Sequence, residues 1–551
     1  MMRQRQRRWS LSIVGALIAL VVSVSVRAQK PDTPATGPSV SVQSLFTHSE
    51  SCVACHNNLS TSSGEDVSIG TAWRSTIMAN SARDPYFLAS VRRETIDHAT
   101  KGAEIQDECA TCHVPAAQKS AHAGGRLATI LDENARTSTD DEHRIARDGV
   151  SCTVCHQIAP EGLGSAESFN GNFRMHPRRV DGTRAVFGPF AVDTGRRSIM
   201  RSVTGFEQAE APHVRQSELC ATCHTLITKA FDREGRVIGS LPEQMNYQEW
   251  RHSAFYNEGR SCQSCHMPRT PGPIRVSSVL GAERDGLSRH AFVGGNAFML
   301  RMLNRYRHLL DVAAPAQELE STARLTERQL QSETATVAVS TPRVIGTRIE
   351  FDVTVRNLTG HKFPTGYPSR RAWLHVTLRD AGGRTLFESG ALSPDASIDG
   401  NDGDKDPATF EEHHDVIERE DDVQIYEPVL GDSTSRPTTG LLSAVKYVKD
   451  NRLLPRGFNK TTADAQIAVF GHATSDATFT DGGDVVHYRL ALPRAETIAR
   501  VDVEFLYQPI GYRWAHNLQG YTAAETTQFV QFFTSLAPSS ATVLASTTWT
   551  R

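Results

Sequence analysis

The spacing of apolar and polar residues changes twice along the chain. From about residue 44 to 300 the apolar positions follow no regular period, and Gly, Asn, Asp and Ser are scattered throughout. This predicts short helices joined by long loops. Residues 296–333 return to a near-helical spacing that is interrupted at Pro315. We therefore expect a helical connector over residues 301–334.

Strict alternation of apolar and polar residues begins near residue 335. In one such run Ile349, Phe351 and Val353 alternate with Glu350 and Asp352. Further runs of this kind occur at 374–378, 486–492 and 501–507. Short alternating runs separated by turns predict a β-sandwich, Ig-like in type, over residues 335–520.

Two further segments complete the predicted organisation. A long, acidic and polar insertion interrupts the β-rich region at about 393–470. Residues 521–551 are expected to form a C-terminal helix, at 523–536, and a tail. The predicted fold class is α+β and multidomain, with a mainly helical and loop domain at 44–300 followed by the connector and the β-sandwich.

The N-terminus has the pattern of a secretion signal. Four arginines between residues 3 and 8 precede an apolar run from Leu11 to Val24, and Val26 and Ala28 suggest cleavage before Gln29. An uncleaved anchor is the alternative, but this run is shorter than the roughly 20 residues that span a bilayer. We expect a signal peptide at 1–28, a flexible lead-in at 29–43, and export to the periplasm or the cell surface with no membrane span after cleavage.

The chain contains ten cysteines, and all of them fall inside Cys-x-x-Cys-His units. The units are Cys52, Cys55 and His56; Cys109, Cys112 and His113; Cys152, Cys155 and His156; Cys220, Cys223 and His224; and Cys262, Cys265 and His266. Two thiols at this spacing can each form a thioether with one vinyl group of a haem, and the following His can bind the iron. Zinc would need Cys pairs that combine into four-ligand clusters. A disulfide framework would leave the five histidines unexplained.

The sequence therefore predicts five covalently bound haems c, which would fill the core of residues 44–300 in place of side chains. The histidine that ends each unit is the predicted proximal ligand of one haem iron. These ligands are His56, His113, His156, His224 and His266.

The distal ligand of each iron is harder to assign from sequence. In low-spin electron carriers it is usually a second His and sometimes Met. The favoured candidates are His48, His213, His290, His361 and Met78, and weaker ones are His98, His122, His143, His176 and His252. Any of these histidines could instead be a surface or packing residue, and Met78 could instead pack on a porphyrin face.

Residues 45–300 resemble periplasmic multihaem cytochromes of the broad cytochrome c-554 type, related to hydroxylamine-oxidoreductase-like proteins. The likeness rests on the repeated units and on their flanking phrases, such as 106–113, 148–152 and 261–268. It implies closely packed haems that move electrons. The family's Trp-x-x-Ser-x-His segment often supplies a distal His, but Met78 and Phe255 stand at that place here. The C-terminal part resembles a β-domain of some multihaem cytochromes, through the phrases Gly360–Gly366 and Asp450–Pro455.

Two functions stay open at this point. An electron carrier, in which both axial positions of every iron are filled, is favoured and needs no catalytic residue. The alternative is a multihaem oxidoreductase for a small nitrogen or sulfur compound, which needs one five-coordinate haem. Pentahaem nitrite reductases carry Lys in place of one motif His, whereas all five units of this chain end in His.

The charge of the chain bears on its partners. The formal net charge is −3, and it becomes −8 when residues 1–28, with five Arg and no acidic residue, are removed. An acidic protein is a poor partner for nucleic acid. It suits a donor and an acceptor redox protein with basic surfaces, although an acidic surface also simply keeps an exported protein soluble.

Metal binding outside haem is a weaker prediction. Residues 399–406 are rich in the oxygen ligands that calcium prefers, but Phe410 rather than Glu stands at the twelfth position of that loop. A solvated acidic loop is the favoured interpretation. His413 and His414, beside acidic residues, could bind a transition metal or belong to a solvated polar turn.

Overall fold

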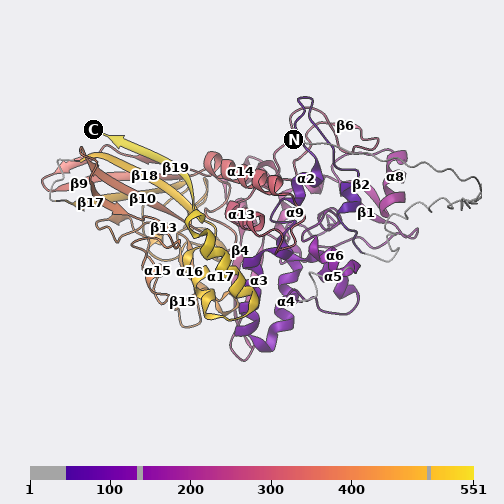
Figure 1. Cartoon of the computed structure of the whole chain (residues 1–551), viewed down its shortest axis with the longest axis horizontal. Coiled ribbons are helices and arrows are strands. Elements are labelled where there is room, and N and C mark those ends of the chain that lie inside the picture. The colour runs from indigo at the N-terminus through magenta and orange to yellow at the C-terminus, as the bar shows by residue number, and fades with distance from the viewer. Residues whose placement is uncertain (1–44, 133–139, 493–497) are drawn as a thin grey trace, which may run out of the picture. The chain divides into compact units, whose positions relative to one another are not determined.

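The computed structural model describes residues 45–132, 140–492 and 498–551 (Figure 1). These residues belong to one compact unit. The predicted signal peptide at 1–28 and the lead-in at 29–43 lie outside the described residues.

The first half of the described chain is helical, with short helices and long loops. The helices are α1 (Glu50–Val53), α2 (Ile69–Arg74), α3 (Pro85–Asp97), α4 (Gly102–His113), α5 (Pro115–Ala123), α6 (Asp141–Arg147), α7 (Cys152–Cys155), α8 (Thr194–Thr204), α9 (Ser217–Ala221), α10 (Asn246–Arg251), α11 (Ala254–Asn257) and α12 (Cys262–His266). Three two-stranded sheets lie between them: β1 (Arg184–Gly188) with β2 (Phe206–Glu210), β3 (Leu226–Phe231) with β4 (Val237–Gln244), and β5 (Ile274–Arg275) with β6 (Glu283–Arg284). The prediction of short helices and loops is thus confirmed.

The predicted helical connector consists of two helices, α13 (Ala297–Arg305) and α14 (Ala316–Glu333). Pro315 is the N-cap of α14, because proline is tolerated where a helix begins but not inside it. On α13, Phe298, Met302 and Leu303 are buried in a core shared with α3 and with the C-terminal helix α17 (Ala524–Leu536). The predicted helix at 523–536 is therefore confirmed to within one residue.

Two five-stranded sheets make up most of the second half. One has the order β11 (Thr385–Ser389), β10 (Arg371–Asp380), β18 (Ile498–Gln508) and β19 (Thr542–Thr550), with β13 (Ile425–Tyr426) also paired to β10. The other has the order β12 (Val416–Ile417), β17 (Gly483–Ala491), β9 (Arg348–Asn357) and β7 (Ala335–Val339), with β8 (Arg343–Ile345) also paired to β9. Figure 1 shows the long strands side by side.

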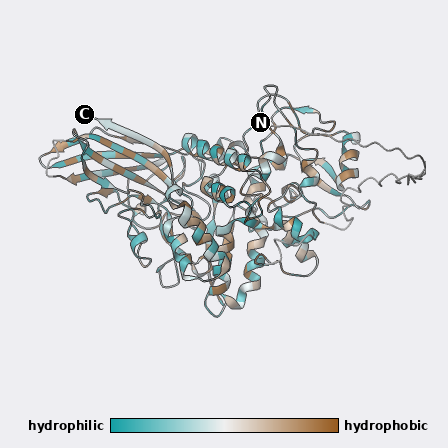
Figure 2. Cartoon of the chain, in the orientation of Figure 1, coloured by the Kyte–Doolittle hydropathy of each residue, from teal (hydrophilic) through white to brown (hydrophobic). Residues whose placement is uncertain are grey.

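The two sheets share one hydrophobic core. Phe351 of β9 and Val486 of β17 lie in the same buried cluster as Leu374 of β10 and Val503 of β18. The strands carry stripes of apolar and polar residues (Figure 2), which is the alternation expected of sheets with one buried face. The chain is therefore a mixed α+β protein with a helical N-terminal region and sheets in its C-terminal half. The Ig-like assignment of the sheets and the domain boundaries stay predictions.

Two parts of the second half differ from the sequence-based expectations. The C-terminal tail is not loose, because β19 pairs antiparallel with β18 along most of its length. The insertion at 393–470 contains short elements: α15 (Asp402–Lys405), β14 (Pro428–Gly431), β15 (Pro437–Thr438) and β16 (Lys446–Asp450). Of the described helices, which also include α16 (Tyr512–His516), none is long and apolar enough to cross a membrane.

Candidate functional site

One large cavity lies among the elements of the helical half. Its volume is about 1310 Å³, which exceeds the roughly 300–1,000 Å³ of a pocket for a single small ligand. All ten motif cysteines and all five motif histidines line it. The structure thus brings the fifteen predicted attachment residues, which are spread over more than 200 positions of sequence, to the wall of one space.

Each Cys-x-x-Cys-His unit forms or ends a helical turn. The third unit begins at the first residue of α7, the fifth unit is α12, and the second unit is the last turn of α4. One helical turn spans 3.6 residues, so the two thiols of a unit point to similar sides. All ten cysteines are free and half-buried. This is the local geometry that attachment of one haem to two thiols requires.

The cysteines also show which units are neighbours. The thiols of Cys52 and Cys152 lie close enough to shift each other's pKa, so the first unit is a neighbour of the third. Cys155 of the third unit lies close enough to Cys223 of the fourth for their charges to interact.

The fourth unit has two further neighbours. Cys223 lies close enough to Cys112 of the second unit for the two thiols to shift each other's pKa, and Cys220 lies equally close to Cys262 of the fifth. The attachment sites therefore form a continuous series in which the fourth unit adjoins the second, third and fifth.

Three of the motif histidines are oriented by backbone carbonyls. The Nδ1 of His56 bonds to the Val276 carbonyl and that of His156 to the Phe187 carbonyl, both at 2.6 Å. His266 is bonded in the same way to the Val293 carbonyl. A proton on Nδ1 leaves the lone pair on Nε2, which is the usual orientation of a histidine that binds a metal.

Burial favours the neutral form of two motif histidines, His113 and His224, which is the form that binds a metal. Burial lowers the pKa of His113 and of His224 to about 4. The His113 ring stacks on Phe87 with ring centres 3.6 Å apart, and its Nδ1 is buried without a hydrogen-bond partner. In the described part of the chain His56, His113 and His224 have no facing imidazole.

Two motif histidines do face a second imidazole. The ring centres of His156 and His290 are 6.3 Å apart with planes 19° from parallel, and those of His266 and His361 are 6.4 Å apart at 10°. Two imidazoles on opposite sides of one metal, each with a metal–nitrogen bond of about 2 Å, have ring centres about 6 Å apart. The separation in both pairs therefore fits a shared metal.

The hydrogen bonds of the two facing rings agree with this geometry. His290 Nδ1 bonds to the Ser288 carbonyl at 3.0 Å, and His361 Nδ1 bonds to the Lys362 carbonyl at 2.8 Å. As in the motif histidines, Nε2 is then left to bind a metal. Both His290 and His361 line the cavity.

The other favoured distal candidates have different surroundings. His48 is not part of the cavity wall, and its Nε2 lies 3.3 Å from the Asp148 carboxylate. His213 is buried beside Phe187, where its Nε2 bonds to the Ile158 carbonyl at 2.8 Å and its Nδ1 has no partner. Met78 lines the cavity. Each of these three stays a prediction.

Among the weaker candidates, only His122 lines the cavity. Its Nε2 is 2.9 Å from both oxygens of Asp107, so a carboxylate already occupies that nitrogen. His98 is buried and bonds to the Asp232 carbonyl and to Ser443. The rest pair with acidic residues away from the cavity: His143 with Asp140, His176 with Glu161, and His252 with Asp464.

The wall of the cavity also suits a flat apolar group. On α8, Ile199, Met200 and Val203 line the cavity, yet Ile199 and Val203 are exposed because no protein side chain covers them. An uncovered apolar helix face of this kind needs a partner. A porphyrin bound beside α8 would supply one, so the wall residues and the donor set both fit haem.

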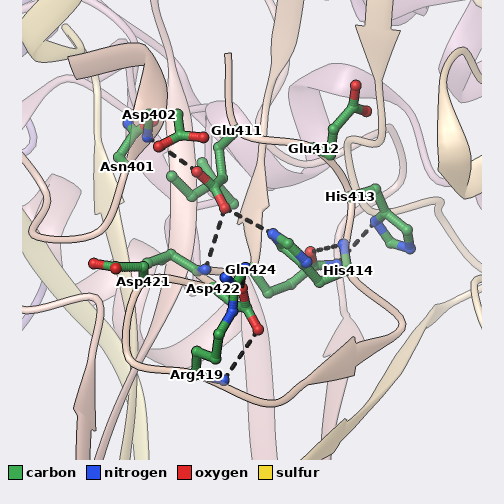
Figure 3. A network of polar contacts seen from close by, with 12 residues as sticks. Asn401, Asp402, Glu411, Glu412, His413, His414, Arg419, Asp421, Asp422 and Gln424 are labelled. Carbon is green, nitrogen blue, oxygen red and sulfur yellow. Dashed lines mark hydrogen bonds and ion pairs between the residues drawn. The ribbon is translucent and has the colours of Figure 1, made fainter. Parts of the chain in front are cut away.

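The predicted acidic loop at 399–406 is exposed at Asp399, Asp402, Lys405 and Asp406, but the insertion around it is partly buried. Asn401, Glu411 and His413 are buried. Glu411 accepts hydrogen bonds from the Asp402 and Val423 backbone amides and lies 2.7 Å from His414 Nε2 (Figure 3). These partners, all within the insertion, satisfy the buried Glu411 carboxylate. Of the two open alternatives for His413 and His414, the solvated polar turn does not hold for His413, which is buried, whereas the His414 side chain is 22% exposed.

The possible metal ligands in this region are bonded to protein groups. Asp404, in the predicted calcium loop, pairs with Arg371 at 2.8 Å and accepts from the Ile398 amide. His413 groups with Asp476 and Asp484. Asp476 lies 2.9 Å from His413 Nε2, and Asp484 accepts from the Tyr426 hydroxyl. This donor set is explained as a buried hydrogen-bond network.

No protein-family model and no curated protein matches the chain. Among solved structures, the chain is similar to a penta-haem cytochrome c552 from Thermochromatium tepidum. The sequence identity is 17% and the TM-score is 0.49, over 92% of this chain and 99% of that one. The functional conclusion therefore depends on the residues of the cavity.

Proposed function

We propose that the chain is an exported pentahaem c-type cytochrome that transfers single electrons between redox partners. The observation that carries the proposal is the convergence of all five Cys-x-x-Cys-His units on one cavity. Each unit offers two thiols for thioether bonds and one histidine for the iron. Haem c supplies an iron that accepts and releases one electron at a time.

The histidines of the cavity wall are proposed as axial ligands. His156 and His290 would hold one iron, and His266 and His361 another, because each pair is nearly parallel at the separation that a shared metal needs. His48, His213 and Met78 remain the proposed sources of ligands for the irons of His56, His113 and His224. Filled axial positions favour a carrier over an enzyme.

The order of the attachment sites supports a carrier as well. The first, third and fourth units follow one another, and the second and fifth units adjoin the fourth. A continuous series of sites is what stepwise electron transfer requires. The acidic charge expected after removal of residues 1–28 suits a basic donor or acceptor in the periplasm or at the cell surface.

The haem content of the purified protein tests the proposal directly. We expect five haems c per chain by the pyridine haemochrome assay, and a mass that exceeds the polypeptide mass by five haems. A Cys262→Ser, Cys265→Ser double variant should carry four haems, since its other four units are unchanged. A protein that contains zinc in place of haem, or a full haem count in the double variant, would contradict it.

The second candidate function is an oxidoreductase for a small nitrogen or sulfur compound. His113 favours it, because the ring that stacks on this histidine is Phe87 rather than an imidazole. An iron without a sixth ligand binds carbon monoxide rapidly, whereas a carrier with filled axial positions does not. We expect no rapid carbon monoxide band in the difference spectrum of the reduced protein. A band from one haem in five would favour the oxidoreductase.

A further inference from the structure

The loop that carries His361 belongs to the β-rich half but reaches the haem cavity. Residues 358–370 connect β9 to β10, and His361, Phe363 and Thr365 of this loop line the cavity. The Ala254 amide donates to the Arg456 carbonyl at 2.7 Å, so a second loop of the β-rich half is bonded to α11 beside it. The β-rich half is thus joined to the wall of the cavity at this place.

The two phrases that resemble a known β-domain meet beside His361. Phe363 of the first phrase and Leu453 of the second form a β-bridge with hydrogen bonds of 2.9 and 2.8 Å. The Asn357 side-chain amide donates to the carbonyls of both His361 and Leu453. The backbone of the His361 loop is therefore fixed to the Asp450–Pro455 segment.

A chain of buried charges runs through this junction. Lys362 Nζ is 2.8 Å from Asp450 Oδ2, and the Arg452 guanidinium is 2.8 Å from the same oxygen. Arg452 also pairs at 2.9 Å with Glu249 of α10, in the helical half, and Glu249 accepts from the Thr365 hydroxyl at 2.6 Å. The four charged side chains are between 0% and 6% exposed.

Burial of these four charged side chains is unfavourable in free energy unless all four are present. Two positive and two negative groups balance, but each charge loses its hydration on burial. Burial alone would oppose ionisation of Asp450, yet Arg452 and Lys362 hold its pKa at about 2. Removal of one member leaves an uncompensated buried charge, which typically costs more than the intact pair contributes. Such a network has one preferred geometry, and the His361 loop is part of it.

We propose that Lys362, Asp450, Arg452 and Glu249 are positioning residues that hold His361 on the haem iron of the fifth unit and tune the potential of that haem. This inference rests on the proposed function, since it takes His266 and His361 as ligands of one iron. Lys362 contributes two contacts: its carbonyl accepts a hydrogen bond from His361 Nδ1, and its ammonium group pairs with Asp450. The β-rich half would thereby supply and fix a ligand for the helical half.

Opposite charge changes test the proposal in the full-length holoprotein. Asp450→Asn removes a negative charge near the fifth unit and should raise the midpoint potential of one haem in five, because ferric haem loses stabilisation. Lys362→Met removes a positive charge and should lower the same potential. Both variants should also show a partial high-spin ferric signal by electron paramagnetic resonance, as His361 is held less firmly. Redox titration with spectroscopy measures both effects.

A matched control separates positioning from general loss of stability. Arg371 and Asp404 form a buried pair of the same kind, at 2.8 Å and 3% exposure each, and neither lines the cavity. Asp404→Asn should lower the unfolding temperature but leave all haem potentials and the spin state unchanged. Equal spectral changes in Asp404→Asn and Asp450→Asn, or potential shifts of one sign in Asp450→Asn and Lys362→Met, would overturn the proposal.

A ligand variant distinguishes the failure of this proposal from that of the proposed function. His361→Ala should convert one haem in five to a high-spin form, and imidazole added in solution should restore the low-spin spectrum. If His361→Ala leaves all haems low-spin, the ligand assignment is wrong. If it converts one haem but Asp450→Asn and Lys362→Met change nothing, only the positioning role fails. A preparation without haem would reject the proposed function itself.

Discussion

The approach of His361 to the haem cavity depends on one glycine. Gly360 precedes His361, and a Cβ atom built on it would lie 2.9 Å from the Phe255 ring. Phe255 cannot easily yield, because it is buried and the Arg260 guanidinium lies over its ring at 4.0 Å. Glycine is required here for close approach, since it is the one residue without a Cβ atom.

We predict that Gly360→Ala displaces His361 from its position opposite His266. Overpacking of a buried contact typically costs about 1–3 kcal/mol, and a shift of the loop would relieve it. The variant should therefore show increased high-spin signal from one haem in five and new carbon monoxide binding. Gly520→Ala is the matched control, because a Cβ atom there meets nothing within 4 Å. Identical spectra for Gly360→Ala and the wild-type protein would contradict the prediction.

At the scale of elements, the alternation of apolar and polar residues predicts those strands that have one buried face. The run at 501–507 could be predicted as a strand from its alternating apolar residues. These residues, Val501, Val503 and Phe505, are fully buried on one side of β18. β19 could not be predicted in this way, because it has no buried apolar face that would give an alternating pattern. Its residues 546–550 are partly or fully exposed, and Leu544 is its one buried side chain. Its strand conformation comes from pairing with β18 rather than from an alternating pattern.

The same contrast holds within the candidate site. The attachment residues could be predicted because each unit is local, with all its chemistry inside five consecutive residues. The facing pairs could not, because His156 and His290, or His266 and His361, meet only after distant elements pack. Likewise, the sequence alone does not predict that Asp450 is buried and paired with Lys362 and Arg452.

At the scale of the whole molecule, the haem cavity lies among buried acidic groups. Burial raises the pKa of Asp84 to about 6, although the Tyr86 and Phe87 amides oppose the shift. Burial also raises the pKa of Glu243 to about 7, and both carboxyls line the cavity. Glu243 lies close enough to Cys109 of the second unit for their charges to interact. Protonation of these groups near neutral pH would therefore change the electrostatic potential at the proposed haems.

We predict that the midpoint potential of the haem at the second unit falls as pH rises from about 5.5 to 8. Above its pKa of about 7, Glu243 carries a negative charge, which stabilises ferric over ferrous haem. The slope cannot exceed about 59 mV per pH unit for one proton per electron. Glu243→Gln, which stays neutral, should weaken the dependence and keep the potential at pH 8 above that of the wild-type protein. Glu104→Gln is the control, because Glu104 is exposed on α4, the helix that carries the second unit. Redox titrations at several pH values measure this, and an unchanged slope in Glu243→Gln would show that this carboxyl is not coupled to electron transfer.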